Sequence, residues 1–98
     1  MKRLEEIFPK TDDAKIAETA LRILSDERSR RKSELVEELK SRVRILGLKV
    51  RHIPDLDYAR VLGKLWFNDY IIYDWDRANP MTRMTESGRD FFTMNYEV

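Results

Sequence analysis

Hydrophobic residues recur at helical spacing in three separate stretches of the chain. In the stretches 11–26, 34–46 and 57–67, apolar side chains gather on one side of a helical wheel and charged ones on the other. Side chains that favour helix N-caps precede each stretch, namely Thr11, Ser33, and Asp55 or Asp57. The pattern therefore predicts three amphipathic helices, each with one face in a common core.

The third predicted helix is sharply two-faced. Leu62 and Leu65 lie on its apolar side, while its polar side carries Arg60 and Lys64 with Gly63 between them. A residue without a side chain on an exposed face lets a helix approach another surface closely, which suits a groove. The alternative is that this glycine is a tolerated weakness within the helix.

Period-two alternation follows the third helix. The aromatic-rich run 70–76 and the run 81–84 both alternate, and Asn79-Pro80 supplies a turn between them, so a β-hairpin is expected. Thr85 then caps a last helix, from 86 to about 94. Phe91 and Phe92 of that helix point about 100° apart. We therefore expect one ring to pack inside and the other to meet a partner.

Three shorter segments are less regular. Leu4, Ile7 and Phe8 predict a short amphipathic turn, which either docks on its own domain or on a partner subunit. The segment 29–32 is predicted to be a basic connector. The segment 48–53 is either a short strand or an extended loop, and Pro54 biases the residue before it away from helix.

Composition limits the class of protein. A chain of 98 residues, 42% hydrophobic and 38% charged, fits one domain with a modest core, and so a binding module rather than an enzyme. The chain has no cysteine, which excludes disulfides and thiolate metal sites. Its apolar runs are too short to span a bilayer, and its start lacks a secretory signal. A cytoplasmic location without membrane contact is expected.

The basic residues are unevenly distributed. Nine Lys and Arg stand against three Glu between 28 and 51, whereas the rest of the chain is acidic and the net charge is only +1. A basic face on an acidic body is typical of proteins that bind polyanions. Chance clustering on a solvated surface is the alternative.

Candidate chemistry beyond this face is sparse. His52 has neither a cysteine nor a second histidine to share a metal or activate a nucleophile. Asp74, Asp76 and Asn79 begin like a calcium loop, but later ligand positions are not filled. We therefore expect no enzyme activity, metal or cofactor. The hairpin region carries aromatic residues that could stack on single-stranded nucleic acid or simply form core, namely Trp66, Tyr70, Tyr73 and Trp75.

Three passages resemble winged helix-turn-helix regulators of the MarR, PadR and ArsR kinds. They are Ser33-Glu-Leu-Val-Glu-Glu-Leu39, Leu62-Gly-Lys-Leu-Trp-Phe-Asn-Asp-Tyr-Ile71 and Met84-Thr-Glu-Ser-Gly-Arg-Asp-Phe-Phe92. The resemblance implies a mainly α fold with a small β-hairpin, in the α+β class, in which a three-helix core is followed by a wing and a C-terminal helix. Residues 1–98 would form one winged-helix domain, with an N-terminal arm (1–10), a core (11–84) and a C-terminal helix (85–98).

The resemblance also implies sequence-specific binding of double-stranded DNA by a transcriptional regulator that acts as a homodimer. The third helix would enter the major groove, and the arm and the C-terminal helix would form the dimer contacts. The predicted DNA-binding residues are Arg60, Lys64 and Asp57 on that helix, Arg77, Asn79 and Arg83 on the wing, and Lys32, Lys49 and Arg51 on flanking phosphates. The alternative is a winged-helix module that binds protein and does not touch DNA.

Overall fold

The computed structural model describes residues 4–26, 28–43, 53–73 and 80–96. These residues form five helices and three strands. The helices are α1 (Leu4–Ile7), α2 (Thr11–Leu24), α3 (Lys32–Val43), α4 (Asp55–Phe67) and α5 (Glu86–Tyr96). The strands are β1 (Arg30–Arg31), β2 (Ile71–Tyr73) and β3 (Met81–Met84). The arrangement is therefore α+β, with helices and one small sheet.

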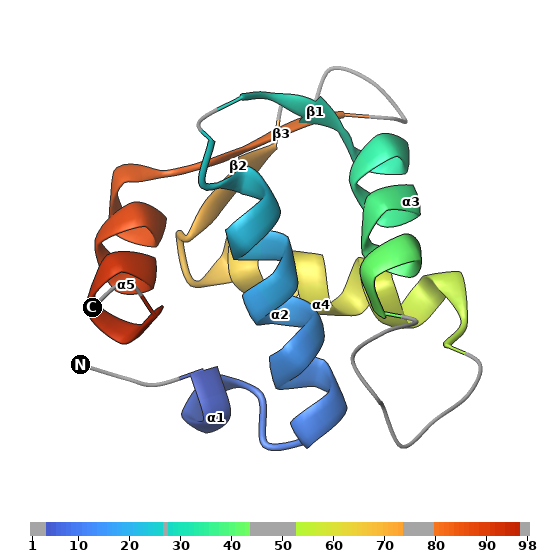
Figure 1. The fold of residues 1–98 in the computed structure, drawn as a ribbon, viewed down its shortest axis with the longest axis horizontal. Coiled ribbons are helices and arrows are strands. Elements are labelled where there is room, and N and C mark those ends of the chain that lie inside the picture. Colours follow the sequence, from blue (N-terminus) through green and yellow to red (C-terminus); the bar gives the residue numbers. More distant parts are fainter. Residues whose placement is uncertain (1–3, 27, 44–52, 74–79, 97–98) are drawn as a thin grey trace.

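The three strands form an antiparallel sheet at one end of the helices, in the order β1-β3-β2 (Figure 1). Arg31 pairs with Met81 on one side of the central strand, and Ile72 pairs with Arg83 on the other. The prediction of a basic connector at 29–32 is wrong, because Arg30 and Arg31 form the strand β1 and Lys32 begins α3. Two residues are too few to show the alternation that identifies a strand. Strand β1 therefore depends on its pairing with β3.

Helix α2 lies at the centre of the molecule. It contacts α1, α3, α4 and α5, with α4 crossing behind it and with α5 and α3 on opposite sides (Figure 1). Because neighbours cover it on several sides, burial extends beyond the predicted apolar stripe to Asp13 and Thr19. The three amphipathic helices are confirmed, and their apolar faces meet in one core.

The N-terminal arm docks on its own domain. Leu4, Ile7 and Phe8 are all buried in the core that α2 helps to form. The Nζ atom of Lys64 lies 5.3 Å from the centroid of the Phe8 ring, which fixes the arm beside α4. Of the two placements that the sequence left open, the structure has the intramolecular one.

Both phenylalanines of α5 are buried in this chain, so the prediction that one of them meets a partner is wrong. Phe91 stacks on Tyr70, with 4.4 Å between ring centroids, and Phe92 lies 5.5 Å from the ring of Tyr96. The guanidinium of Arg22 on α2 covers the Phe92 ring at 5.3 Å. The two rings point in different directions, but α2 and the start of the hairpin cover both directions.

Helix starts differ from the predicted caps in three places. Lys10, not Thr11, holds the N-cap position of α2 and makes no side-chain cap bond. Helix α3 starts at Lys32, one residue before the predicted cap, because the chain passes directly from β1 into the helix. Helix α4 starts at Asp55, two residues earlier than predicted.

The predicted cap of α5 is confirmed. The hydroxyl oxygen of Thr85 accepts a hydrogen bond from the Gly88 N–H at 2.9 Å and donates one to the carbonyl of Asp69. Helix α5 runs slightly further than predicted, to Tyr96. The predictions for residues 44–52 and 74–79, which include the end of the second helix and the tip of the hairpin, lie outside the described residues.

Candidate nucleic-acid interface

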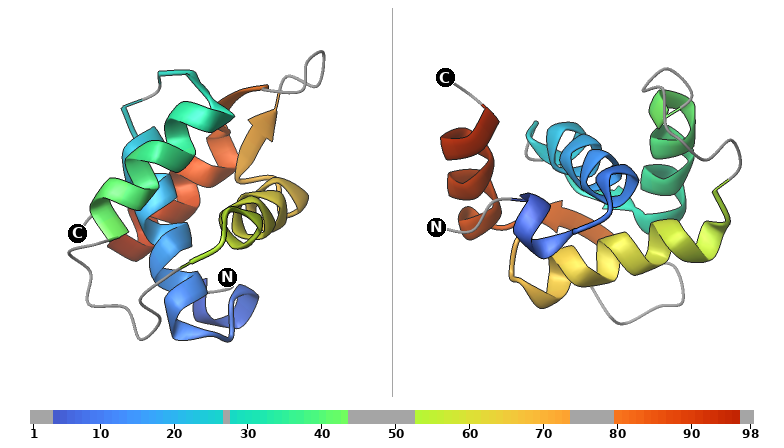
Figure 2. Two further views of the ribbon diagram at one scale, coloured as in Figure 1. Left: turned by 90° about the vertical axis from the view of Figure 1, so that its right-hand side faces the viewer. Right: turned by 90° about the horizontal axis from the view of Figure 1, so that it is seen from below.

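One side of α4 is not covered by any other described element, and its residues form a single stripe. Leu56, Gly63 and Phe67 are spaced seven and four residues apart, which places them in one line on a helix. The side chains of Leu56 and Phe67 are 77% and 81% exposed. We call this stripe the outer face of α4; Figure 2 shows α4 at the edge of the molecule in both views.

The opposite side of α4 packs against α2, α3 and β2. Tyr58, Val61, Leu62 and Leu65 are buried there, as the sequence predicts. Trp66, which was predicted on the same apolar side, is 40% exposed, because it lies at the border between the packed side and the outer face. The core therefore fixes which side of α4 is free to meet a ligand.

Arg60 is held on one flank of this outer face by an ion pair with Asp13 of α2. Its Nη1 and Nη2 atoms lie 2.9 and 3.0 Å from the two carboxylate oxygens of Asp13, and its Nε lies 3.7 Å from Asp57. The hydrogen bonds that Arg60 donates to Asp13 raise the pKa of Arg60 above its usual value. Two of the N–H donor groups of Arg60, a predicted DNA-binding residue, are therefore engaged inside the chain.

Lys64 lies on the same flank, since its ammonium group sits over the ring of Phe8 in the N-terminal arm. We call this side, with Arg60 and Lys64, the arm flank of α4. The resemblance assigned its two best DNA contacts to this helix, and the structure brings both to one flank rather than to the centre of the outer face.

The other flank of α4 faces the sheet and the start of α3, and we call it the hairpin flank. The rings of Trp66 and Tyr73 are parallel within 5° at 6.4 Å, and the Nζ atom of Lys32 lies 5.8 Å from the Tyr73 ring. A groove of about 280 Å³ runs between α3 and α4, lined in part by Lys32 and Ala59. Lys32 therefore lies where α3, β2 and α4 approach one another.

Asp55 and Glu37 in that groove form ion pairs with Lys40. The Nζ atom of Lys40 lies 2.7 Å from Asp55 and 3.5 Å from Glu37, and the hydrogen bond that Lys40 donates to Asp55 raises the pKa of Lys40. The carboxylate at the start of α4 therefore carries less uncompensated negative charge than the sequence suggests. Lys32, at the other end of the groove, has its ammonium group over the Tyr73 ring.

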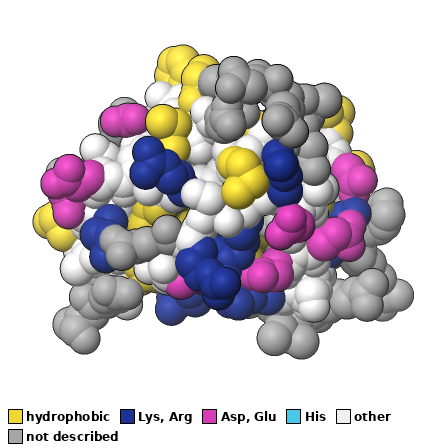
Figure 3. Space-filling view, turned by 90° about the horizontal axis from the view of Figure 1, so that it is seen from above, with side chains coloured by type: hydrophobic (Ala, Val, Ile, Leu, Met, Phe, Trp, Pro, Cys, Tyr) yellow, Lys and Arg dark blue, Asp and Glu magenta, His cyan; other side chains and the backbone are white. Residues whose placement is uncertain are grey.

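The outer side of the sheet combines basic and apolar side chains. Residues paired across antiparallel strands share a face, so Arg83 lies with Ile72, and Arg31 lies with Met81. A hollow of about 310 Å³ lies here, lined by Ser29, Ile72, Tyr73, Met81 and Arg83. Figure 3, which views this end of the molecule, shows Lys and Arg side chains beside hydrophobic ones in the middle of the view, with acidic side chains on both sides of them.

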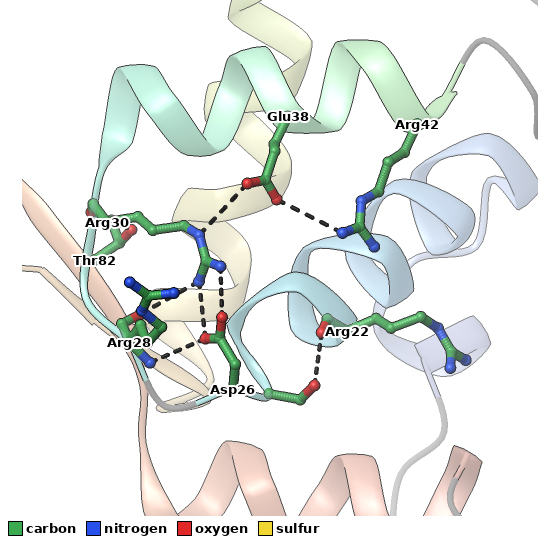
Figure 4. Close-up of polar contacts among 8 residues, drawn as sticks. Arg22, Asp26, Arg28, Arg30, Glu38, Arg42 and Thr82 are labelled. Carbon is green, nitrogen blue, oxygen red and sulfur yellow. Dashed lines mark hydrogen bonds and ion pairs between the residues drawn. The ribbon is translucent and has the colours of Figure 1, made fainter.

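Part of the basic segment is used inside the fold, which sequence reasoning missed (Figure 4). Arg30 binds Asp26 through two hydrogen bonds of 2.9 and 2.6 Å, and its Nε lies 3.7 Å from Glu38. Glu38 also lies 3.8 Å from Arg42. The bonds from Arg30, and then from the N–H of Arg28, hold the pKa of Asp26 well below its usual range. This network, the Arg30 network, joins the end of α2 to β1 and α3.

The predicted DNA-binding residues thus fall into three groups. Asp57, Arg60 and Lys64 lie together on the arm flank of α4. Lys32 and Arg83 lie on the side of the sheet and hairpin. The remaining four, Lys49, Arg51, Arg77 and Asn79, lie outside the described residues.

The predicted aromatic platform is divided. Trp66 and Tyr73 stack on one another, whereas Tyr70 stacks on Phe91 of α5, and Trp75 lies outside the described residues. Tyr73 is buried and Tyr70 is half-buried, whereas Trp66 is 40% exposed, so the described rings do not form one open stacking surface.

Among the residues with described positions, no group of three or more His, Cys, Asp or Glu could hold a metal ion. None of the helices in those same ranges is long and apolar enough to cross a membrane. Comparisons with protein-family models, with curated proteins and with solved structures found no match. Functional inference therefore rests on the geometry around α4.

Proposed function

We propose that this chain is a winged helix-turn-helix domain that binds double-stranded DNA, with the outer face of α4 in the major groove. The observation that carries the proposal is the order α2, β1, α3, α4, β2, β3 together with the strand order β1-β3-β2. This order puts α4 directly after α3 and directly before a hairpin, and leaves its outer face uncovered by described elements. Domains of this kind read DNA with the helix that occupies this place.

Charge on both sides of α4 supports the proposal. Lys64 lies on the arm flank, where the charge of Arg60 is paired with Asp13, and Lys32 lies on the hairpin flank. A helix in the major groove has a phosphate backbone on each side, and cations on both flanks can neutralise both. Lys32 comes from the basic segment 28–51 and Lys64 comes from outside it, so the basic borders of α4 are only partly made of that segment.

The small and apolar centre of the outer face also fits a groove. Apart from the adjoining residues and backbone of α4 itself, no atom of the described residues lies within 4 Å of the place where a Cβ on Gly63 would stand. Leu56 and Phe67, on either side of this glycine, are exposed apolar groups. In the major groove, apolar side chains contact the methyl group of thymine. We therefore propose that α4 reads thymine methyls and that its flanks hold phosphates.

The proposed regulator acts as a two-fold dimer, because one such helix covers only a half-site. The apolar side chains of the arm, such as Leu4 and Phe8, are buried in their own chain, as are Phe91 and Phe92 of α5. Met94 on α5 is 65% exposed and is an apolar group that this end still offers to a second copy. Sedimentation of the DNA complex tests the stoichiometry.

The direct test is a titration of a fluorescently labelled duplex with the full chain at several salt concentrations. We expect log affinity to fall linearly with log salt, because each phosphate contact releases counterions. Replacing Lys32 with Ala should make the slope shallower by about 0.9, the value for one phosphate contact. Arg89→Ala, which removes the same charge from the exposed side of α5, should leave the slope unchanged. An affinity that is independent of salt would contradict the proposal.

A second candidate function is binding of protein through the same face of α4. The observation that favours it is the exposure of Leu56 and Phe67 on one helix face, since exposed apolar patches often mark protein interfaces. If this function holds, the chain should fail to bind duplex DNA at low salt but should self-associate in sedimentation. Phe67→Ser should then abolish the association, whereas Lys32→Ala should not.

A further inference from the structure

The ion pair between Asp13 and Arg60 is unequal in exposure. The Asp13 side chain is only 12% exposed, whereas the Arg60 side chain is 46% exposed. Asp13 stands in the first turn of α2, the central helix, which neighbours hold on several sides. The acid is therefore the fixed partner, and the long side chain of Arg60 is the partner that can leave.

The pair also cancels the charge that DNA binding would use. Asp13 accepts hydrogen bonds from Nη1 and Nη2 of Arg60, the same atoms from which arginine donates two hydrogen bonds to guanine or to a phosphate. While this pair is intact, Arg60 contributes no net positive charge to the arm flank. Lys64, on the same flank, has an aromatic ring rather than a carboxylate beside its ammonium group.

We propose that Asp13 restrains Arg60 and thereby limits the affinity of the domain for DNA. In the free protein, Asp13 holds the guanidinium on the arm flank, and a phosphate or a guanine must compete with a partly buried carboxylate to take it. Asp13 acts through Arg60 and is a positioning residue that does not itself touch DNA. This inference rests on the proposed DNA-binding function.

A purely structural role for the pair makes a different prediction. If Asp13 and Arg60 only join α2 to α4, removing the carboxylate should lower the thermal stability and leave the salt dependence of DNA binding unchanged. If Asp13 restrains Arg60, removing it should free one cation next to the phosphate backbone. The salt slope separates the two roles, because stability alone does not change the number of counterions released.

The experiment compares Asp13→Asn with Asp12→Asn in the full chain, using a fluorescently labelled duplex of mixed sequence. Both variants lose one negative charge from the same turn of α2, and Asp13 is the residue that accepts the two hydrogen bonds from Nη1 and Nη2 of Arg60. We expect Asp13→Asn to bind more tightly, with a salt slope steeper by about 0.9, and Asp12→Asn to keep the wild-type slope. Equal slopes for the two variants would overturn the inference.

The double variant Asp13→Asn, Arg60→Gln provides a second test, which also serves if Asp13→Asn alone does not fold. Two amides can keep a hydrogen bond at this position and leave the pair neutral, as it is in the wild type. We expect the double variant to return to the wild-type slope. A slope shallower by about 0.9 would mean that Arg60 already contacts phosphate despite Asp13, and would overturn the inference.

The outcomes separate the failure of this inference from the failure of the proposed function. If no variant, including the wild type, binds duplex DNA at low salt, the proposed function fails, and the inference fails with it. If the wild type binds with a salt-dependent affinity but Asp13→Asn matches Asp12→Asn, only the restraint of Arg60 is wrong.

Discussion

The two helical glycines with described positions stand in opposite surroundings. A Cβ on Gly88 of α5 would lie 2.0 Å from the carbonyl oxygen of Tyr70, whereas a Cβ on Gly63 of α4 would meet nothing within 4 Å. Both residues weaken their helices in the same way, because glycine has the poorest helix propensity after proline. The fold explains the first glycine and does not explain the second.

The chain itself fills the space around Gly88, whereas the space around Gly63 is open. Around Gly88, the Tyr70 carbonyl also accepts the N–H of Thr85, so α5 is joined directly to the end of α4 and the start of β2. Around Gly63, the neighbouring side chains of the outer face point away from the core, with Leu56 and Phe67 largely exposed. The open glycine lies on the face that we propose enters the DNA groove.

The largest expected effect is on stability and comes from substitution of Gly88. Gly88→Ala places a methyl group inside the contact distance of a backbone oxygen, so α5 or the β2 start must shift. We expect a loss of at least about 3 kcal/mol of unfolding free energy, at the high end for overpacked sites. Urea denaturation measures this loss of unfolding free energy. A variant as stable as the wild type would show that this junction is not tightly packed in solution.

Substitution of Arg30 should have the next largest effect. Arg30 is the covered partner in the Arg30 network, with a side chain only 17% exposed, and Arg30→Gln removes its bonds to Asp26 and Glu38. We expect a loss of about 1–2 kcal/mol, typical of charged hydrogen bonds. Arg42→Gln, at the exposed end of the same network, should cost less than about 0.5 kcal/mol. Equal losses in thermal unfolding would contradict this ranking.

Gly63→Ala should change stability and binding in opposite directions. We expect the unfolding free energy to rise by about 0.5–1 kcal/mol, because alanine favours the helix and meets open space. Binding to duplex DNA should weaken, since the added methyl group separates α4 from the groove. Titration at one fixed salt concentration, beside denaturation of the same sample, checks both. Unchanged affinity would mean that α4 does not approach DNA at this position.

The smallest expected effect is on the stability of the fold at alkaline pH, through Tyr96 of α5. Burial, followed by the nearby Glu18 and Glu5, raises the pKa of Tyr96 from 10.0 to about 12. Because the folded protein holds this proton more tightly than the unfolded chain, the stability contribution is complete below pH 10.0 and falls as pH rises toward about 12. Tyr96→Phe should flatten that part of the stability profile in denaturation at increasing pH. An unchanged profile would assign the loss to other groups.

Much of the fold could be predicted from periodicity and turn chemistry. Apolar spacing located α2, α3 and α4, and the Thr85 cap and the strand 81–84 appear in the structure where the sequence put them. These features depend on residues that are close in sequence, so local pattern is sufficient to find them. The chemistry of the candidate site was less accessible, because it depends on contacts between distant segments.

Three contacts between distant segments were decided only by tertiary structure. The strand β1 exists because β3 pairs with it, and two residues cannot show a strand pattern alone. Phe91 and Phe92 are both buried because α2 and Tyr70 cover two directions of α5. Arg60, chosen from the sequence as a free DNA contact, is bound by Asp13, which is 47 residues away in the chain. No local pattern reports such a pair.

The sequence by itself therefore determined the helices, the hairpin strands and the side of α4 that faces outward. Tertiary structure decided which cations remain available, because charges are neutralised by whichever residues the fold brings within a few ångströms. Arg30, Lys40 and Arg42 have carboxylate partners, while Lys32 and Lys64 lie over aromatic rings beside α4. The basic segment seen in the sequence and the basic borders of α4 are thus only partly made of the same residues.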